Sequence, residues 1–289
     1  MFDRIKNELL NIGLKFISVD EKIVRMFLET SPSNVNEIVI LPAVKIVMKK
    51  VVNKLEKKIK KGLVYNGFLN GIMVSVIRSY VGSPSCAMIM ECLKRCKTKK
   101  IIRVDFCGGI QTQSNNMQIG DIIIPNLAYC GDGTSAQYIL KEPSLEQRLE
   151  SIENPRLRFQ NMVTGNRRVY KVKSNTRIKN LLMENAKEMD IPNHKEVDLW
   201  TTDALFCETL DFINSLKFIE VETIDMESSI LFLLGKLYNL KVASILSVSD
   251  LPTTRFDLLQ SNEINPNYEK GINTAINLLI QTLPEINKI

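Results

Sequence analysis

The sequence contains almost no histidine and no closely paired cysteines. Its 289 residues include one histidine, His194, and six cysteines, none of which forms a Cys-x-x-Cys pair. A zinc site needs about four ligands, so no metal site is expected, and no motif points to a cofactor. Unpaired thiols are typical of proteins kept in a reducing compartment.

Long apolar runs are also missing. No stretch of about 20 apolar residues occurs, as a membrane-spanning helix would require. The first 22 residues lack an apolar run followed by a small-residue cleavage site, so no secretory signal is expected. We therefore expect a cytoplasmic protein without a membrane partner.

The positive charge is concentrated in one segment. The net charge is +6, and the lysines gather at Lys45, Lys49, Lys50, Lys54, Lys57, Lys58, Lys60 and Lys61. No aromatic residues are interleaved with them to stack on bases, so no nucleic-acid partner is expected. A solvated, lysine-rich helix face is the simplest interpretation, and attraction of a charged ligand or partner stays open.

Apolar runs alternate with helical patterns over most of the chain. Strands are predicted at 37–42, 72–77, 101–104, 120–125, 197–201 and 241–248, and helices at 19–29, after 42, 83–97, 175–189, 228–238 and 268–283. Turns are predicted at 65–67, 69–71 and 108–109, and Ser83 is the expected helix N-cap. This order predicts an α/β fold with a parallel or mixed sheet.

No linker divides the chain, so we expect a single domain over residues 1–289. Residues 1–36 are interpreted as an N-terminal extension. Residues 141–168 contain two prolines and many charges without a clear period, which indicates a surface insertion.

Polar residues stand at the ends of several predicted strands. Arg103 and Asp105 accompany one strand, Ser249 and Asp250 follow another, and Asp203 follows a third. In open α/β sheets, ligands bind beyond the carboxyl ends of the strands. These residues therefore predict a pocket, in which Arg103 is suited to an anion.

Four segments together resemble the nucleoside phosphorylase family, which includes hexameric purine nucleoside phosphorylases and uridine phosphorylases. Residues 101–109 are similar to the family's Ile-Arg-Val-Gly-Ser/Thr-Cys-Gly, and residues 224–229 to its Val-Glu/Asp-Met-Glu. The other two are 120–124 with 131–135, and Ser249-Asp250. The resemblance covers about residues 39–283. It implies a three-layer α/β/α fold with a central mixed sheet, phosphorylase/hydrolase-like, in a homo-oligomer (a dimer or hexamer).

The resemblance implies a glycosyltransferase of purine salvage. Such an enzyme cleaves the N-glycosidic bond of a nucleoside with phosphate, giving free base and ribose 1-phosphate. Met226 and Glu227 would hold the ribose, and Asp250 would protonate the departing purine. The nucleoside pocket would further include Val81, Phe206, Ile224 and Ser249. A purine substrate is favoured because uridine-type relatives often lack the acid at the position of Asp250.

Three of these residues also have an ordinary structural interpretation. Glu227 would interact with the dipole of the helix that follows it. Asp250 would cap a turn, and Phe206 would pack in the core. These alternatives stay open at the level of sequence.

The phosphate-binding motifs depart from the family pattern. In the family's Gly-Asp-Pro-x-Arg loop, Ala43 replaces the glycine and Val47 replaces the arginine. In the second element, Asp105 replaces a glycine and Phe106 replaces the hydroxyl residue, which leaves Arg103 as the matched anion ligand. Since a hydrogen bond to a charged group contributes about 1.5–3 kcal/mol, these changes remove on the order of 3–6 kcal/mol of phosphate binding.

Three functions therefore stay open. The chain is a phosphorylase with a rebuilt phosphate site, with Lys45, Lys49, Arg78 or Arg255 adding positive charge. Alternatively it binds a nucleoside or nucleobase without phosphorolysis, as a pseudoenzyme. The third alternative is a hydrolase, in which Asp105 orients a water molecule that replaces phosphate.

Overall fold

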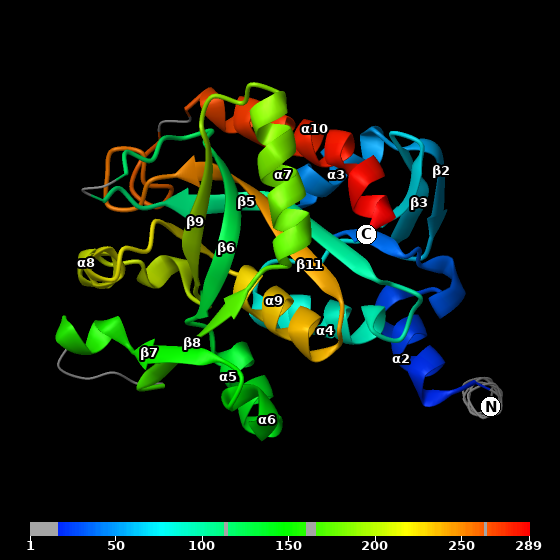
Figure 1. The fold of residues 1–289 in the computed structure, drawn as a ribbon, viewed down its shortest axis with the longest axis horizontal. Coiled ribbons are helices and arrows are strands. Elements are labelled where there is room, and N and C mark those ends of the chain that lie inside the picture. The colour runs from blue at the N-terminus through cyan, green and yellow to red at the C-terminus, as the bar shows by residue number, and fades with distance from the viewer. Residues whose placement is uncertain (1–16, 113–114, 160–165, 263–264) are drawn as a thin grey trace, which may run out of the picture.

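The computed structural model describes residues 17–112, 115–159, 166–262 and 265–289 (Figure 1). The strands are β1 (Ile38–Ile40), β2 (Glu56–Lys61), β3 (Val64–Leu69), β4 (Ile72–Val76), β5 (Lys100–Gly109), β6 (Ile122–Cys130), β7 (Glu150–Glu153), β8 (Arg168–Lys173), β9 (His194–Thr201), β10 (Thr223–Asp225) and β11 (Lys241–Asp250). The α-helices are α2 (Val19–Leu28), α3 (Lys45–Asn53), α4 (Ser83–Leu93), α5 (Gly133–Lys141), α6 (Pro143–Glu146), α7 (Thr176–Glu188), α8 (Leu210–Phe218), α9 (Ser228–Leu237) and α10 (Asn267–Lys288). Short 3₁₀ turns are η1 (Pro32–Asn34), η2 (Pro155–Arg158) and η3 (Leu205–Cys207).

The strands form one mixed sheet in the order β2-β3-β4-β1-β5-β10-β9-β6-β8-β7, and β11 pairs with both β5 and β6. Because β10 joins β5 to β9, and β9 pairs with β6, the strands β5, β10, β9, β6 and β11 close into a ring. Strand β11 runs parallel to β5. The predicted mixed sheet is confirmed.

Helices cover both sides of the sheet, which confirms the three-layer α/β/α architecture (Figure 1). On one face, Ile101 and Cys107 of β5 pack in a core cluster with side chains of α2, α4 and α9. On the other face, Ile102 and Val104 pack with α3, α7 and α10. Odd and even residues of β5 thus face opposite layers, as the two-residue period of a strand requires.

The glycine turn predicted at Gly108 and Gly109 is wrong, because β5 continues through both residues. A Cβ atom on Gly108 would lie 2.8 Å from Ile224, and one on Gly109 would lie 2.6 Å from Met117. These glycines allow neighbouring side chains to approach the strand. They do not bend the chain.

The turn predicted at 65–67 is also wrong, since these residues lie inside β3. The side-chain oxygen of Asn66 accepts hydrogen bonds from Asn36 and Ser75, so Asn66 holds neighbouring strands together. The turn at 69–71 is confirmed. Asn70 and Gly71 both have positive φ, 48° and 73°, between β3 and β4.

The lysine-rich segment is not a single helix face. Helix α3 ends before Lys54, and the last four lysines lie on β2, an edge strand whose residues are all exposed. Lys57 and Lys60 lie over the rings of Phe68 and Tyr65, both on β3. Lysines on an edge strand discourage pairing with other chains.

The predicted insertion at 141–168 contains regular structure in its described part. It includes α6, β7 and η2, and β7 pairs antiparallel with β8. Residues 160–165 lie outside the described residues, as do residues 1–16 of the predicted N-terminal extension. The rest of that extension includes α2, which is held in the core by Val24 and Leu28. Within the described ranges, no helix is both long and apolar enough to span a membrane.

Candidate active site

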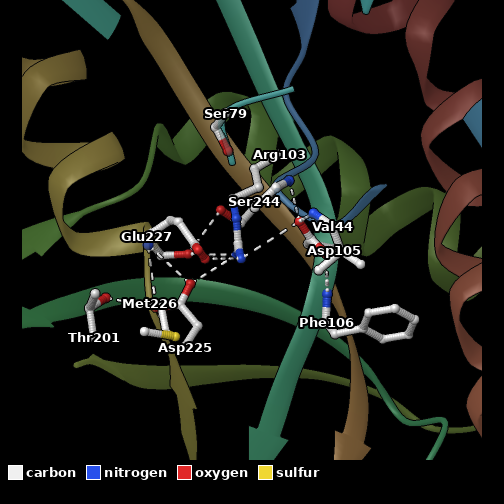
Figure 2. Close-up of polar contacts among 12 residues, drawn as sticks. Val44, Ser79, Arg103, Asp105, Phe106, Thr201, Asp225, Met226, Glu227 and Ser244 are labelled. Atoms are coloured by element: carbon white, nitrogen blue, oxygen red, sulfur yellow. Dashed lines mark hydrogen bonds and ion pairs between the residues drawn. The ribbon is translucent and has the colours of Figure 1, made fainter. Parts of the chain in front are cut away.

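A buried arginine lies at the centre of the candidate site. Arg103 is 2% exposed, and its Nη1 donates to Oδ2 of Asp225 at 2.9 Å. Its Nη2 pairs with Glu227 and lies 4.0 Å from Oδ2 of Asp105. Figure 2 shows the three carboxylates gathered around the guanidinium. One positive charge therefore faces three negative ones when all four groups are ionised.

Local structure brings these side chains together. Arg103 and Asp105 are two residues apart on β5 and so lie on the same face of the sheet. Asp225 ends β10, and its carboxylate accepts hydrogen bonds from the N–H of Ser228 at 3.0 Å and the hydroxyl of Thr201 at 2.7 Å. Strand β10 and the start of α9 thereby position the acidic partners of Arg103.

Both carboxylate oxygens of Glu227 have partners. Oε1 accepts the N–H of Gly82 at 2.7 Å, and Oε2 pairs with Arg103. The side chain is 2% exposed. The pKa of Glu227 is raised to about 7; burial is the main cause, Arg103 opposes the shift, and the charges of Asp225 and Asp105 add to it.

The segment before α4 is tied to this cluster. Gly82, with φ +100°, occupies the N-cap position predicted for Ser83. The hydroxyl of Ser83 instead donates to the carbonyl of Met226 at 3.0 Å. Tyr80 has φ +61°, and Val81 is 49% exposed. The predicted pocket residues Val81 and Met226 thus belong to adjoining segments.

Asp105 points toward the loop after β1. Its Oδ2 accepts the N–H of Ala43 at 2.5 Å and that of Val44 at 3.1 Å, and its Oδ1 accepts the N–H of Phe106 at 3.0 Å. Its side chain is fully buried. Burial raises the pKa of Asp105, while Arg103 and the three N–H groups oppose this shift.

Phe106 lies on the face of the sheet opposite Arg103. Its ring stacks on Tyr268 of α10 with ring centroids 4.4 Å apart, and Figure 2 shows it directed away from the charged cluster. Val47 is fully buried and packs from α3 into the core of that same face.

A further buried carboxyl ends β11. Asp250 is 7% exposed and is in register with Gly108, which pairs on its other side with Ile224 of β10. The hydroxyl of Ser249 donates to Oδ1 of Asp250 at 2.6 Å. Burial raises the pKa of Asp250 to about 6; the hydrogen bond from Ser249 opposes the shift, and Asp257 adds to it.

Glu208 is a neighbour of Asp250 that the sequence reasoning missed. Burial raises its pKa to about 8, and the charges of Asp250 and Asp257 add to the shift. Glu208 follows η3, a single 3₁₀ turn, so no periodic pattern marked it. Asp225 lies within the matched motif at residues 224–229, but the motif alone assigns it no role.

The remaining predicted residues lie in contrasting environments. Phe206 is 85% exposed on η3, so its interpretation as a core residue is wrong. Ile224 is buried in a cluster with Trp200. Among the candidate extra cations, Arg78 donates to the carbonyl of Ala43 at 2.8 Å.

No group of His, Cys, Asp and Glu side chains within the described part of the chain has the arrangement of a metal site.

The mixed sheet between two helical layers, with a buried carboxylate cluster on β5, β10 and β11, defines an α/β protein of the three-layer class. The phosphorylase superfamily matches residues 37–284 of the sequence, and the chain belongs to this superfamily. The prediction that it is a member of the nucleoside phosphorylase family is thereby confirmed.

Known proteins agree with this assignment. A DeoD-type purine nucleoside phosphorylase of Buchnera aphidicola is 28% identical over 189 residues, which cover 65% of this chain and 67% of that protein. A uridine phosphorylase of Vibrio fischeri has a TM-score of 0.65 at 20% identity, over 87% of this chain and 93% of that chain. A purine nucleoside phosphorylase of Toxoplasma gondii has a TM-score of 0.68 at 17% identity, over 90% and 95%. At these identities, the two structures establish the fold.

Proposed function

We propose that this chain binds a purine nucleoside where β5, β10 and β11 meet and cleaves its N-glycosidic bond. The observation that carries the proposal is the position of Asp250, a buried carboxyl at the end of β11. It is in register with Gly108, on the strand that bears Arg103. A carboxyl that stays partly protonated near neutral pH is suited to donate a proton to a departing base.

The charged cluster supports the same chemistry. Cleavage of the glycosidic bond places positive charge on the ribose as the base leaves. Asp105, Asp225 and Glu227 outnumber the one arginine among them, so the local field favours a cationic sugar. Glu227 would accept hydrogen bonds from the ribose hydroxyls, with Met226 alongside, and Phe206 would cover the base.

Phosphate is the acceptor in the family reaction, which gives free base and ribose 1-phosphate. If water is the acceptor, its oxygen bonds to C1′, the C1′–N bond breaks, and ribose and free base result. A second candidate function is nucleoside binding without turnover. It is favoured by Asp105, whose carboxylate already accepts the N–H groups of Ala43 and Val44 in the segment that aligns with the family's phosphate loop.

Incubation of inosine, adenosine and uridine with and without phosphate tests the proposal through release of free base. Release that requires phosphate supports a phosphorylase, and release at equal rates without phosphate supports a hydrolase. No release, together with a rise in melting temperature on adding nucleoside, supports a binding protein. The proposal would be contradicted if no nucleoside released free base and none raised the melting temperature.

A further inference from the structure

The loop after β1 presents two consecutive N–H groups, from Ala43 and Val44, to a single oxygen atom. Converging backbone N–H groups of this kind form an anion-binding concavity. In this protein the oxygen belongs to Asp105 of the neighbouring strand β5. A third N–H, from Phe106, binds the other oxygen of the same carboxylate.

We propose that Asp105 is a built-in anion that occupies the N–H groups of the loop after β1, so that the protein neither binds nor uses inorganic phosphate. The neighbouring nucleoside site is taken from the proposed function. Asp105 is then the residue that decides specificity for the acceptor, and base release proceeds with water or does not occur.

The balance of charge supports this assignment. Arg103 already pairs with Asp225 and Glu227, and Asp105 lies 4.0 Å from its Nη2. Its Nε is buried and has no hydrogen-bond partner among the described residues. Because both terminal nitrogens of the guanidinium already face carboxylates, Arg103 offers no open fork for a multiply charged anion. A phosphate would also add negative charge beside three carboxylates, which repel it.

Arg78 approaches this loop from the other side. Arg78 donates to the carbonyl oxygen of Ala43, in the peptide unit whose N–H belongs to Val44. In a trans peptide the carbonyl and the N–H point in opposite directions. Arg78 therefore contacts the side of the loop opposite Asp105. Lys45 and Lys49 are exposed on α3.

The sequence offered Phe106 as a second obstacle to phosphate, and the structure separates the two residues. Phe106 faces α10 and stacks on Tyr268, whereas Asp105 faces Arg103. The proposal therefore assigns the exclusion of phosphate to Asp105 alone.

The test compares wild type with the variants Asp105→Gly and Phe106→Ser. Phosphate binding is measured by calorimetry and by melting temperature at constant ionic strength. Wild type and Phe106→Ser should show no binding. Asp105→Gly frees the two N–H groups, so phosphate should raise its melting temperature by about 2 °C or more. Asp198→Asn, which removes a half-buried carboxylate on β9, is the matched control and should gain nothing.

Phosphate binding to wild type, or base release by wild type that rises with phosphate, would overturn the proposal. So would a folded Asp105→Gly variant that gains no phosphate binding. If Asp105→Gly does not fold, Asp105→Asn takes its place, because it removes the charge at nearly constant size. Titration of wild type with phosphate would still show whether the protein binds phosphate. Absence of nucleoside binding in every variant would count against the proposed function, while the phosphate comparison would still test Asp105.

Discussion

At the scale of single residues, three carboxyl groups share one physical cause for their shifted pKa values. Asp250 and Glu227 are buried and Glu208 is partly buried, and the loss of surrounding water favours the uncharged form of each. Carboxyl groups whose pKa values are raised in this way are common at functional sites.

The role of Asp250 is tested by Asp250→Asn. The amide keeps the size of the side chain but cannot donate the proton as the acid does, so release of purine should fall about 10²–10⁴-fold. Inosine binding, measured by calorimetry, should persist. Asp198→Asn serves as control and should cleave at the wild-type rate. An unchanged rate in Asp250→Asn would remove the general acid from the proposal.

The pH dependence of base release follows from two of these groups. Asp250 acts when protonated, so its contribution falls as the pH rises through about 6. Glu227 accepts from ribose when ionised, so its contribution falls as the pH drops through about 7. We expect a bell-shaped profile of kcat against pH with its maximum between 6 and 7. A rate that rises steadily to pH 9 would be inconsistent with this pairing of roles.

At the scale of secondary structure, the side chains of β5 alternate between two faces of the sheet, and the two faces have different roles. Its odd residues carry the charged cluster, and its even residues carry the apolar contacts with α3, α7 and α10. A residue replaced in a family motif therefore affects the site only if it lies on the site's face. Asp105 does so, and Phe106 does not.

The close packing at the end of β5 predicts an effect on stability. In Gly109→Ala, the added Cβ would lie 2.6 Å from Met117 and 2.9 Å from Leu251. Overpacking of this kind costs about 1–3 kcal/mol, which denaturant unfolding would measure. Gly133→Ala is the control, because its nearest neighbour, in Asp203, is 3.4 Å away. Equal stability of the two variants would show that β5 tolerates side chains at this position.

At the scale of the whole molecule, the same buried carboxyls make stability depend on pH. A carboxyl whose pKa is higher in the folded state than in the unfolded state binds its proton more tightly when the protein is folded. Its contribution to the free energy of unfolding is complete at pH values below the unfolded-state pKa, and it is lost as the pH rises through the folded-state pKa. For Asp250 and Glu227, that loss spans about pH 4 to 7. The free energy of unfolding should fall by about 4–6 kcal/mol over this range. Urea unfolding at several pH values measures it, and a constant or rising value would contradict the assigned shifts.

The homo-oligomer implied by the family resemblance stays a prediction. The strongly exposed ring of Phe206 and the exposed Val81 are apolar surfaces that a ligand or a second copy of the chain would cover. Sedimentation velocity with and without nucleoside would distinguish these occupants.

The layered α/β architecture follows from the sequence because its cause is periodic and local. Apolar runs of strand length alternate with amphipathic helices, and most predicted elements form, with shifted ends. The turns predicted at 65–67 and 108–109 are wrong because the glycines there allow close packing within a strand. At Gly108 the reason for glycine is the side chain of Ile224, more than 100 residues further along the chain, and no local pattern records it.

The order of the motifs in the sequence identified the family. The same motifs contain the charged residues of the candidate site, which are Arg103, Asp105, Glu227 and Asp250. The contacts of these residues depend on strands β1, β5, β10 and β11, which come together only in the folded sheet. Sequence alone showed that Asp105 replaces a glycine. Tertiary structure decided that its carboxylate meets the N–H groups of Ala43 and Val44, because strand pairing places a loop 61 residues away beside it.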